Sequence, residues 1–334
     1  MISRRRFLAG SAALASLRPS LAWARSTDAR PTETTQALIS ITLDLEMSRN
    51  FPTWDQTHWD YEKGNLDADT KKYALQAARR VKEKGGIVHF FAVGRVFEQE
   101  SIDWLEEIVK TGHPVGNHTY DHVNVKAQEA NDIQFRFQRA PWLIQGKKPL
   151  EVIAENIRMT NLALKARLGI EPAGFRTPGG FPNGLEDRVD IQKLLLDLGF
   201  SWVSSKYPTH STGSPGQEPS DEVLESILKA QELAQPFAYS TGLLEIPMSP
   251  ISDVTAFRSG RWSLHSFLKA VEKALDRAVE RRAVFDFLGH PSCLLVMDPE
   301  FRTIDLICDK VRNCGNRAAI VDLQDIARSA RRTP

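Results

Sequence analysis

Two histidines, His118 and His122, lie four residues apart. On a helical turn this spacing would bring both imidazoles to one side, with Cβ atoms about 5–6 Å apart, so that two ring nitrogens could reach one zinc ion. Zinc sites that react with substrates use three protein ligands, and a carboxylate from the segment 44–46 would complete such a set. The spacing alone is more often that of ordinary surface or core histidines, so the elements around the pair decide its meaning.

Those elements alternate along the chain. Short runs rich in β-branched and aromatic residues predict strands at 37–45, 87–92, 114–117, 173–176, 201–204, 243–247, 284–288 and 318–322. Segments of helical period lie between most of them, at 69–84, 101–110, 150–168, 191–198 and 263–281. This alternation favours a parallel sheet with crossover helices, and seven or eight such units are enough to close a barrel.

Polar side chains stand at the ends of four predicted strands. Asp44 and Glu46 end the first, His118 and His122 follow the third, Arg176 ends the fourth, and His290 follows the seventh. Because reactive groups gather at the carboxyl ends of strands in parallel α/β barrels, we expect these four clusters to meet.

Composition and the amino-terminal residues bear on partners and location. A formal net charge of +1 over 334 residues argues against a nucleic-acid partner. A basic start at residues 4–6, a short apolar stretch and the small residues Ala22 and Ala24 resemble a twin-arginine signal with its cleavage site. We therefore expect a signal peptide at 1–24, a linker at 25–36, the twin-arginine machinery as a partner, and a periplasmic or secreted protein. No later segment is apolar and long enough for a transmembrane helix.

The segment from Gly112 to His122 resembles the second motif of the polysaccharide deacetylases, the NodB-homology domain or carbohydrate esterase family 4. Residues 42–46, 176–180 and 288–290 resemble the first, third and fifth motifs, and all occur in family order over residues 39–321. The resemblance implies a distorted (β/α) barrel of seven or eight parallel strands over residues 37–330. It also implies deacetylation of an acetylated glycan, at nitrogen or oxygen, with peptidoglycan, chitin-like oligomers and exopolysaccharides as candidates.

The resemblance also implies roles for individual residues. An acetamide is a poor electrophile, so a divalent metal must polarise its carbonyl and acidify the attacking water. Asp44 would take the water proton, and Arg176 would hold Asp44 ionised by a charge-assisted hydrogen bond. A backbone N–H near Gly179 would help the metal to stabilise the oxyanion, and His290 would protonate the leaving amine.

The first motif departs from the family pattern of two adjacent aspartates, because Leu45 occupies the second place. Alternation along the strand puts Asp44 and Glu46 on one face, so we expect Glu46 to hold the metal with His118 and His122. The reverse assignment, with Asp44 on the metal and Glu46 as base, stays open. The expected ion is zinc, and cobalt, nickel or iron would fit similar ligands.

The fourth motif normally supplies an aspartate that tunes the catalytic histidine, but Val203 stands in its place. His290 would then be tuned by Asp286, by Ser204 or by neither. Two competing functions follow from these departures. One is hydrolysis of a small non-sugar amide or cyclic ureide on the same fold, and the other is a catalytically silent glycan-binding module.

Aromatic residues in the long connections are candidates for contact with sugar rings. Trp54 and Trp59 follow the first motif, and Trp142 lies in the insertion after the second. Packing that anchors the loops would use the same residue types, so both readings stand. We expect the insertion 126–148 to set substrate specificity.

Overall fold

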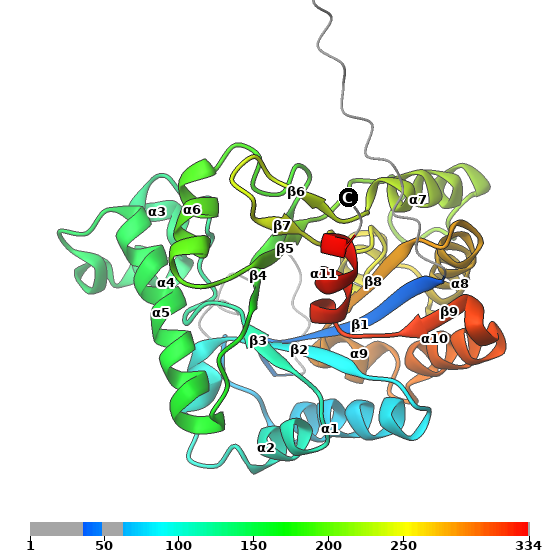
Figure 1. The fold of residues 1–334 in the computed structure, drawn as a ribbon, viewed down its shortest axis with the longest axis horizontal. Coiled ribbons are helices and arrows are strands. Elements are labelled where there is room, and N and C mark those ends of the chain that lie inside the picture. Colours follow the sequence, from blue (N-terminus) through cyan, green and yellow to red (C-terminus); the bar gives the residue numbers. More distant parts are fainter. Residues whose placement is uncertain (1–35, 49–62, 333–334) are drawn as a thin grey trace, which may run out of the picture. The chain divides into compact units, whose positions relative to one another are not determined.

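The structure is a computed structural model that describes residues 36–48 and 63–332. The predicted signal peptide, most of the predicted linker, and Trp54 and Trp59 lie outside these residues, so the domain limits remain predictions. Within the described residues nine strands form one sheet (Figure 1). They are β1 (Ala37–Leu45), β2 (Val88–Ala92), β3 (Val115–Asn117), β4 (Gly174–Phe181), β5 (Trp202–Lys206), β6 (Phe237–Ala238), β7 (Leu244–Glu245), β8 (Val284–Gly289) and β9 (Ala318–Ile320).

The sheet runs in the order β6-β7-β5-β4-β3-β2-β1-β8, and β9 pairs with the first residues of β1. Only β6 runs antiparallel among the described strands, so eight strands are parallel. Beyond β7, the amide of Ser249 donates to the carbonyl of Asp286 in β8 at 2.9 Å, which brings the two ends of the sheet together. The predicted distorted barrel of seven or eight parallel strands is confirmed.

β1 is the most enclosed strand and carries the first motif. It pairs with β2 on one side and with β8 on the other, and all nine of its residues are buried. A parallel strand covered on both faces reads as a nearly continuous apolar run, which is why 37–45 was recognisable in the sequence. Its last residues, Asp44 and Leu45, therefore arrive at the carboxyl edge of the sheet in a fixed position.

Helices cover the outside of the sheet. Asp67 caps α1 (Ala68–Glu83) by accepting from the amide of Thr70 at 2.8 Å, and Ser263 caps α8 (Leu264–Arg281) by accepting from Ser266 at 3.2 Å. Their apolar faces pack with β1 and β8 in the largest core cluster. The other α-helices are α2 (Asp103–Lys110), α3 (Ala130–Ile133), α4 (Phe135–Arg139), α5 (Pro149–Leu168), α6 (Val189–Asp197), α7 (Asp221–Leu233), α9 (Pro291–Met297), α10 (Arg302–Asn313) and α11 (Leu323–Arg332).

The insertion after the second motif is ordered into short helical pieces. It contains α3, α4 and the 3₁₀ segment η3 (Pro141–Ile144), followed by α5. Ile133, Phe137 and Ile144 anchor these pieces in a second apolar cluster against α5. Across the described part of the chain, none of the helices has the length and apolar character needed to cross a membrane.

Candidate metal and catalytic site

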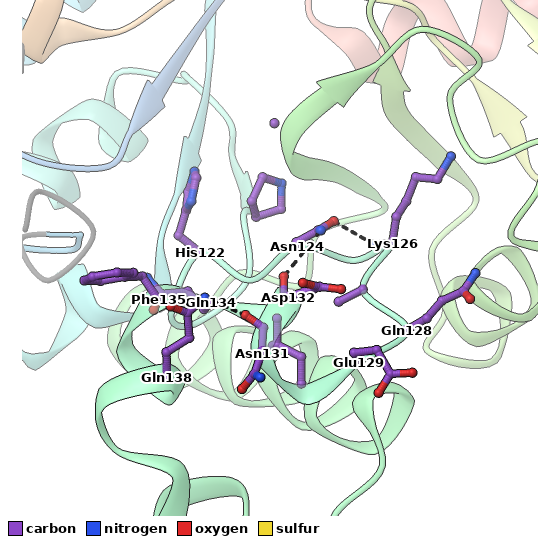
Figure 2. A pocket seen from close by; sticks show the side chains of 14 residues that line it. His122, Asn124, Lys126, Gln128, Glu129, Asn131, Asp132, Gln134, Phe135 and Gln138 are labelled. Atoms are coloured by element: carbon purple, nitrogen blue, oxygen red, sulfur yellow. Dashed lines mark hydrogen bonds between the residues drawn. The ribbon is translucent and has the colours of Figure 1, made fainter. Parts of the chain in front are cut away.

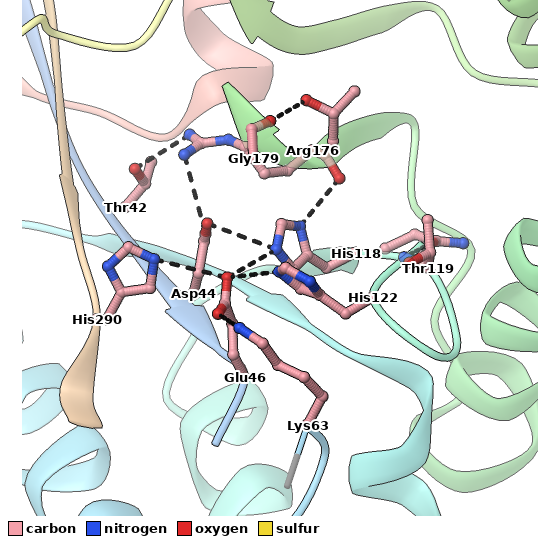
Figure 3. Close-up of polar contacts among 12 residues, drawn as sticks. Thr42, Asp44, Glu46, Lys63, His118, Thr119, His122, Arg176, Gly179 and His290 are labelled. Atoms are coloured by element: carbon pink, nitrogen blue, oxygen red, sulfur yellow. Dashed lines mark hydrogen bonds and ion pairs between the residues drawn. The ribbon is translucent and has the colours of Figure 1, made fainter. Parts of the chain in front are cut away.

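The predicted site residues of β1, β3, β4 and β8 meet at the carboxyl edge of the sheet (Figure 3). Asp44 is the penultimate residue of β1 and Glu46 follows the strand, and their exposed fractions are 4% and 8%. Burying two carboxylates this close together is costly unless cations or metals face them. The surrounding residues supply such partners.

The two histidines converge, although not on the helical turn that the spacing predicted. Residues 118–122 form an irregular loop after β3, in which Thr119 and His122 have φ values of +59° and +58°. Left-handed backbone is uncommon for residues with a side chain and is often found at functional sites. The side chain of Asn117 stabilises the loop by accepting from the amide of Thr119 at 2.8 Å. The strained turn thus brings both imidazoles to the same carboxylate.

That carboxylate is Glu46. Its Oε1 lies 3.1 Å from Nε2 of His118 and 3.0 Å from Nε2 of His122. Ligand atoms that share one tetrahedral zinc ion at about 2.0–2.2 Å are about 3.3 Å apart, so these three atoms have the spacing of a ligand set. Asp44 is further away, with Oδ2 3.8 Å from Nε2 of His118. The geometry favours Glu46 over Asp44 as the third ligand.

The contacts of His118 fix which of its ring nitrogens faces Glu46. Its Nδ1 lies 3.0 Å from the carbonyl oxygen of Arg176. A carbonyl only accepts, so Nδ1 carries the proton, and in the neutral ring Nε2 presents a lone pair. Nε2 faces an oxygen of Glu46 at 3.1 Å, so the two atoms could bind one positive ion together. A backbone carbonyl that accepts from one ring nitrogen and so orients the other is typical of histidines that bind metals.

The ionisation of the other two candidate ligands also suits a metal. Burial lowers the pKa of His122 to about 4, and the positive charge of Lys63 adds to this effect. Burial alone would raise the pKa of Glu46, but the nearby His122, Lys63 and His290 lower it well below its usual range. A neutral imidazole and an ionised carboxylate are the forms that coordinate metals.

Lys63 is a member of the site that the sequence analysis missed. Its side chain is 2% exposed, and its ammonium group forms an ion pair with Oε2 of Glu46. The two oxygens of Glu46 therefore face different partners, Oε1 toward the histidines and Oε2 toward Lys63 (Figure 3). This arrangement leaves one oxygen of Glu46 to face an ion.

Arg176 lies in the site but its hydrogen bonds differ from the prediction. Its Nη1 is 3.8 Å from Oδ1 of Asp44, which is too long for a hydrogen bond. Instead Nη2 donates to Thr42 at 3.1 Å and to Asp286 at 2.8 Å, and the guanidinium lies over the ring of Phe91. Arg176 thus acts on Asp44 as a nearby charge, while its direct partner is Asp286. Oδ1 of Asp44 is buried and has no hydrogen-bond partner among the described residues.

His290 has a carboxylate partner that was not predicted. Its backbone N donates to Oδ2 of Asp253 at 2.7 Å, and its Nδ1 lies 2.9 Å from Oδ1 of the same residue. Asp286 and Ser204, the partners considered from the sequence, do not fill this role, because Asp286 faces Arg176 inside the barrel. Burial alone would lower the pKa of His290, but Asp253 and Glu46 raise it to about 10. The imidazole is therefore held protonated, as a proton donor must be.

Gly179 lies close to the site, on the turn within β4. It has a φ of +73°, a conformation that suits glycine, and its carbonyl accepts from the hydroxyl of Thr177 at 2.8 Å. Together with His122 it lines a pocket of about 740 Å³. Its predicted role as an N–H donor stays a prediction.

Comparison with known proteins agrees with the sequence motifs. A profile of the polysaccharide deacetylase family matches residues 60–199. The predicted resemblance is thereby confirmed: this part of the chain is similar to a family of hydrolases that act on carbon–nitrogen bonds other than peptide bonds. No curated protein matches the sequence.

Solved structures share the fold at low sequence identity. A protein from Mycobacterium smegmatis and one from Pseudomonas aeruginosa PAO1, both described as polysaccharide deacetylases, each have a TM-score of 0.59 and 15% identity. Puue allantoinase has a TM-score of 0.57 and 14% identity. In all three cases 89% of this chain and 91% of the other are covered. At this identity the likeness establishes the fold, and activity has to be argued from the site.

Proposed function

We propose that the protein is an exported, zinc-dependent deacetylase that hydrolyses acetyl groups on a polysaccharide or peptidoglycan. The primary target is the carbon–nitrogen bond of an N-acetyl sugar, and an O-acetyl ester is the second bond type that the same chemistry would cleave. The observation that carries the proposal is the convergence of a ring nitrogen from His118 and one from His122 on the same oxygen of Glu46, at 3.1 and 3.0 Å. Cobalt, nickel or iron would fit the same donors.

Glu46, His118 and His122 would hold the metal. When bound, a divalent ion supplies a Lewis acid that polarises the acetyl carbonyl and makes water a better nucleophile. Lys63 positions Glu46 through its second oxygen. The carbonyl of Arg176 fixes the tautomer of His118, which presents Nε2 to the centre.

Asp44 would act as general base. Its Oδ1 is buried without a hydrogen-bond partner among the described residues, so it is ready to accept a proton from the attacking water. The charge of Arg176, 3.8 Å away, favours the ionised carboxylate before the proton is taken. The backbone N–H near Gly179 would donate to the oxygen that becomes negative during attack.

His290 would act as general acid. Expulsion of an amine requires a proton on nitrogen, and the imidazole of His290 carries one because Asp253 stabilises its charge. Asp253 is completely buried and bonds both the backbone and the ring of His290, so it also fixes the direction in which Nε2 points. The reading as a silent module rested on the absent acid at Val203, and Asp253 removes that reason.

Acetate release by the mature protein tests the proposal. The panel contains N-acetylglucosamine oligomers, peptidoglycan, an O-acetylated polysaccharide and, for the ureide alternative, allantoin. We expect acetate from a glycan, loss of activity after chelation, and recovery with zinc. His118→Ala should be inactive, whereas His265→Ala, a matched change of an exposed histidine on α8, should be fully active. Acetate release that withstands complete metal removal would overturn the metal mechanism, and hydrolysis of allantoin alone would favour the ureide.

The proposed location is the periplasm or the exterior, reached through the twin-arginine machinery. We expect the protein to appear in the periplasmic fraction without residues 1–24. Replacement of Arg4 and Arg5 by lysine should keep the precursor in the cytoplasm. A chain that stays in the cytoplasm with its amino terminus intact would contradict this part of the proposal.

A further inference from the structure

A large groove runs from the metal site across the insertion. Its volume is about 740 Å³, which lies in the range of small-molecule and cofactor sites. The insertion supplies most of its walls, through residues 124–138, and Pro178 and Gly179 supply the rest (Figure 2). His122 also lines it, so the groove opens directly on the proposed ligand set. A substrate whose acetyl group lies at the metal site would extend into this groove.

Four of the polar residues that line the groove have side chains without a partner among the described residues. Gln128, Glu129, Asn131 and Asp132 are exposed, and their side chains make no hydrogen bond or ion pair within residues 36–48 and 63–332. By contrast, the ammonium group of Lys126 is paired with Asp187. Two carboxylates and two amides thus remain available to a ligand that carries many donors and acceptors.

A second pocket adjoins the groove at Asn131. Its volume is about 440 Å³, it shares Asn131 with the groove, and its lining includes Trp142. The side chain of Trp142 is 68% exposed, which is unusual for so large an apolar group. An indole face in this position offers a flat surface on which the C–H face of a sugar can pack.

We propose that this path, from His122 past Glu129 and Asp132 to Trp142, binds an amino-sugar chain of several residues that is neutral or positively charged. The inference rests on the proposed deacetylase function and adds the class of substrate. The two available carboxylates repel glycans that carry uronate, sulfate or phosphate groups. They attract the ammonium groups that N-deacetylation itself creates. Sugars already deacetylated therefore bind along the path while the next acetyl group reaches the metal site.

Binding to a catalytically inactive protein tests this inference without turnover. The probes are N-acetylglucosamine oligomers of two and five residues, each fully acetylated or about half deacetylated, titrated into Asp44→Asn protein. We expect the half-deacetylated pentamer to bind most tightly. On that background Trp142→Ala should weaken binding of the pentamer about threefold to tenfold and leave the dimer nearly unchanged. Leu233→Ala, which removes an equally exposed side chain on α7, is the control.

The charge effect is tested separately. Glu129→Gln with Asp132→Asn should abolish the preference for the half-deacetylated pentamer, an effect of about twofold to fivefold that disappears near 1 M salt. The control pair, Glu100→Gln with Glu300→Gln, removes the same charge from exposed positions outside the groove and should keep the preference.

Unchanged pentamer binding in both groove variants, or tighter binding of a uronate pentamer, would overturn the inference. Acetate release by the wild type is measured on the same preparations. If the wild type releases acetate but the groove variants bind the pentamer as tightly as their parent, only this inference fails. If the protein binds glycan but the wild type releases no acetate, the proposed activity fails.

Discussion

Replacement of Asp253 by asparagine tests the pairing that the sequence did not predict. Asp253 is completely buried, and its two oxygens separately accept the backbone N–H and the Nδ1 proton of His290 at 2.7 and 2.9 Å. Asparagine has one oxygen and one amino group, so one of these donors must face another donor. The variant removes the charge, keeps nearly the same volume, and loses at least one of the hydrogen bonds that Asp253 accepts, which also include one from the amide of Val254.

The expected loss has a catalytic and a stability component. Without the carboxylate of Asp253, His290 loses the strongest effect that raises its pKa and keeps only that of Glu46, so the pKa falls from about 10 toward its ordinary value. General acid catalysis then fails at neutral pH, and kcat should fall about 10²-fold to 10⁴-fold. Breaking a buried ion pair costs about 3–5 kcal/mol of unfolding free energy.

The sign of the pH dependence follows from the raised pKa. A histidine whose pKa is higher in the folded state stabilises the fold fully below its unfolded pKa of about 6.5 and loses this contribution as the pH rises to about 10. The stability difference between wild type and variant should therefore be largest at pH 6 and smaller at pH 10. Urea denaturation at both pH values, with and without zinc, measures it.

Kinetics and NMR titration of the His290 ring complete this assay. Asp197→Asn, a matched change of an exposed carboxylate at the end of α6, should behave like the wild type. If Asp253→Asn kept the wild-type kcat and His290 still titrated above pH 9, Asp253 would not tune the acid and the reasoning would be refuted.

Three further changes test the buried charges. Lys63→Met should lower the unfolding free energy of the metal-free protein by about 3–5 kcal/mol. With zinc bound the loss should be much smaller, because the ion then compensates the charge of Glu46. An equal loss in both forms would show that Lys63 acts only structurally. Arg176→Met removes the cation that pairs with Asp286. Burial raises the pKa of Asp286 to about 6. The variant's destabilisation should therefore be smaller at pH 5 than at pH 8 in denaturation experiments. His118→Ala should no longer retain one equivalent of zinc after dialysis, as measured by elemental analysis of the folded protein.

Much of the fold was predictable because its strands are covered on both faces. The predicted strand 37–45 coincides with β1, and the others differ by a few residues at their ends. β6 escaped prediction because a strand of two residues has no periodicity to detect. The helices of the insertion escaped for a similar reason, since α3 and α4 have four and five residues. Long-range pairing, rather than local preference, determines such elements.

The site was predictable where its residues fall in motifs and not where tertiary contacts select them. Spacing and strand alternation pointed to Glu46, His118 and His122, although the left-handed turn that joins the histidines has no sequence signature. Asp253 lies 37 residues before His290, so no local pattern joins them. Asp253 does come after the predicted strand 243–247. Because reactive groups gather after the carboxyl ends of strands, this position would have made it a candidate.

The position of β1 beside β8 also determines when the site can exist. The hydroxyl of Thr42 donates to the carbonyl of Phe287 across 245 positions of the sequence, and His290 follows that strand. At about 5–20 residues per second, a ribosome needs roughly 10–50 s to complete β8 after β1. A nascent chain therefore has Glu46, His118 and His122 long before it has the general acid, and the complete site forms only in a nearly complete polypeptide. If the twin-arginine route carries the folded protein, as we propose, the cytoplasmic metal pool decides which ion the exported enzyme contains.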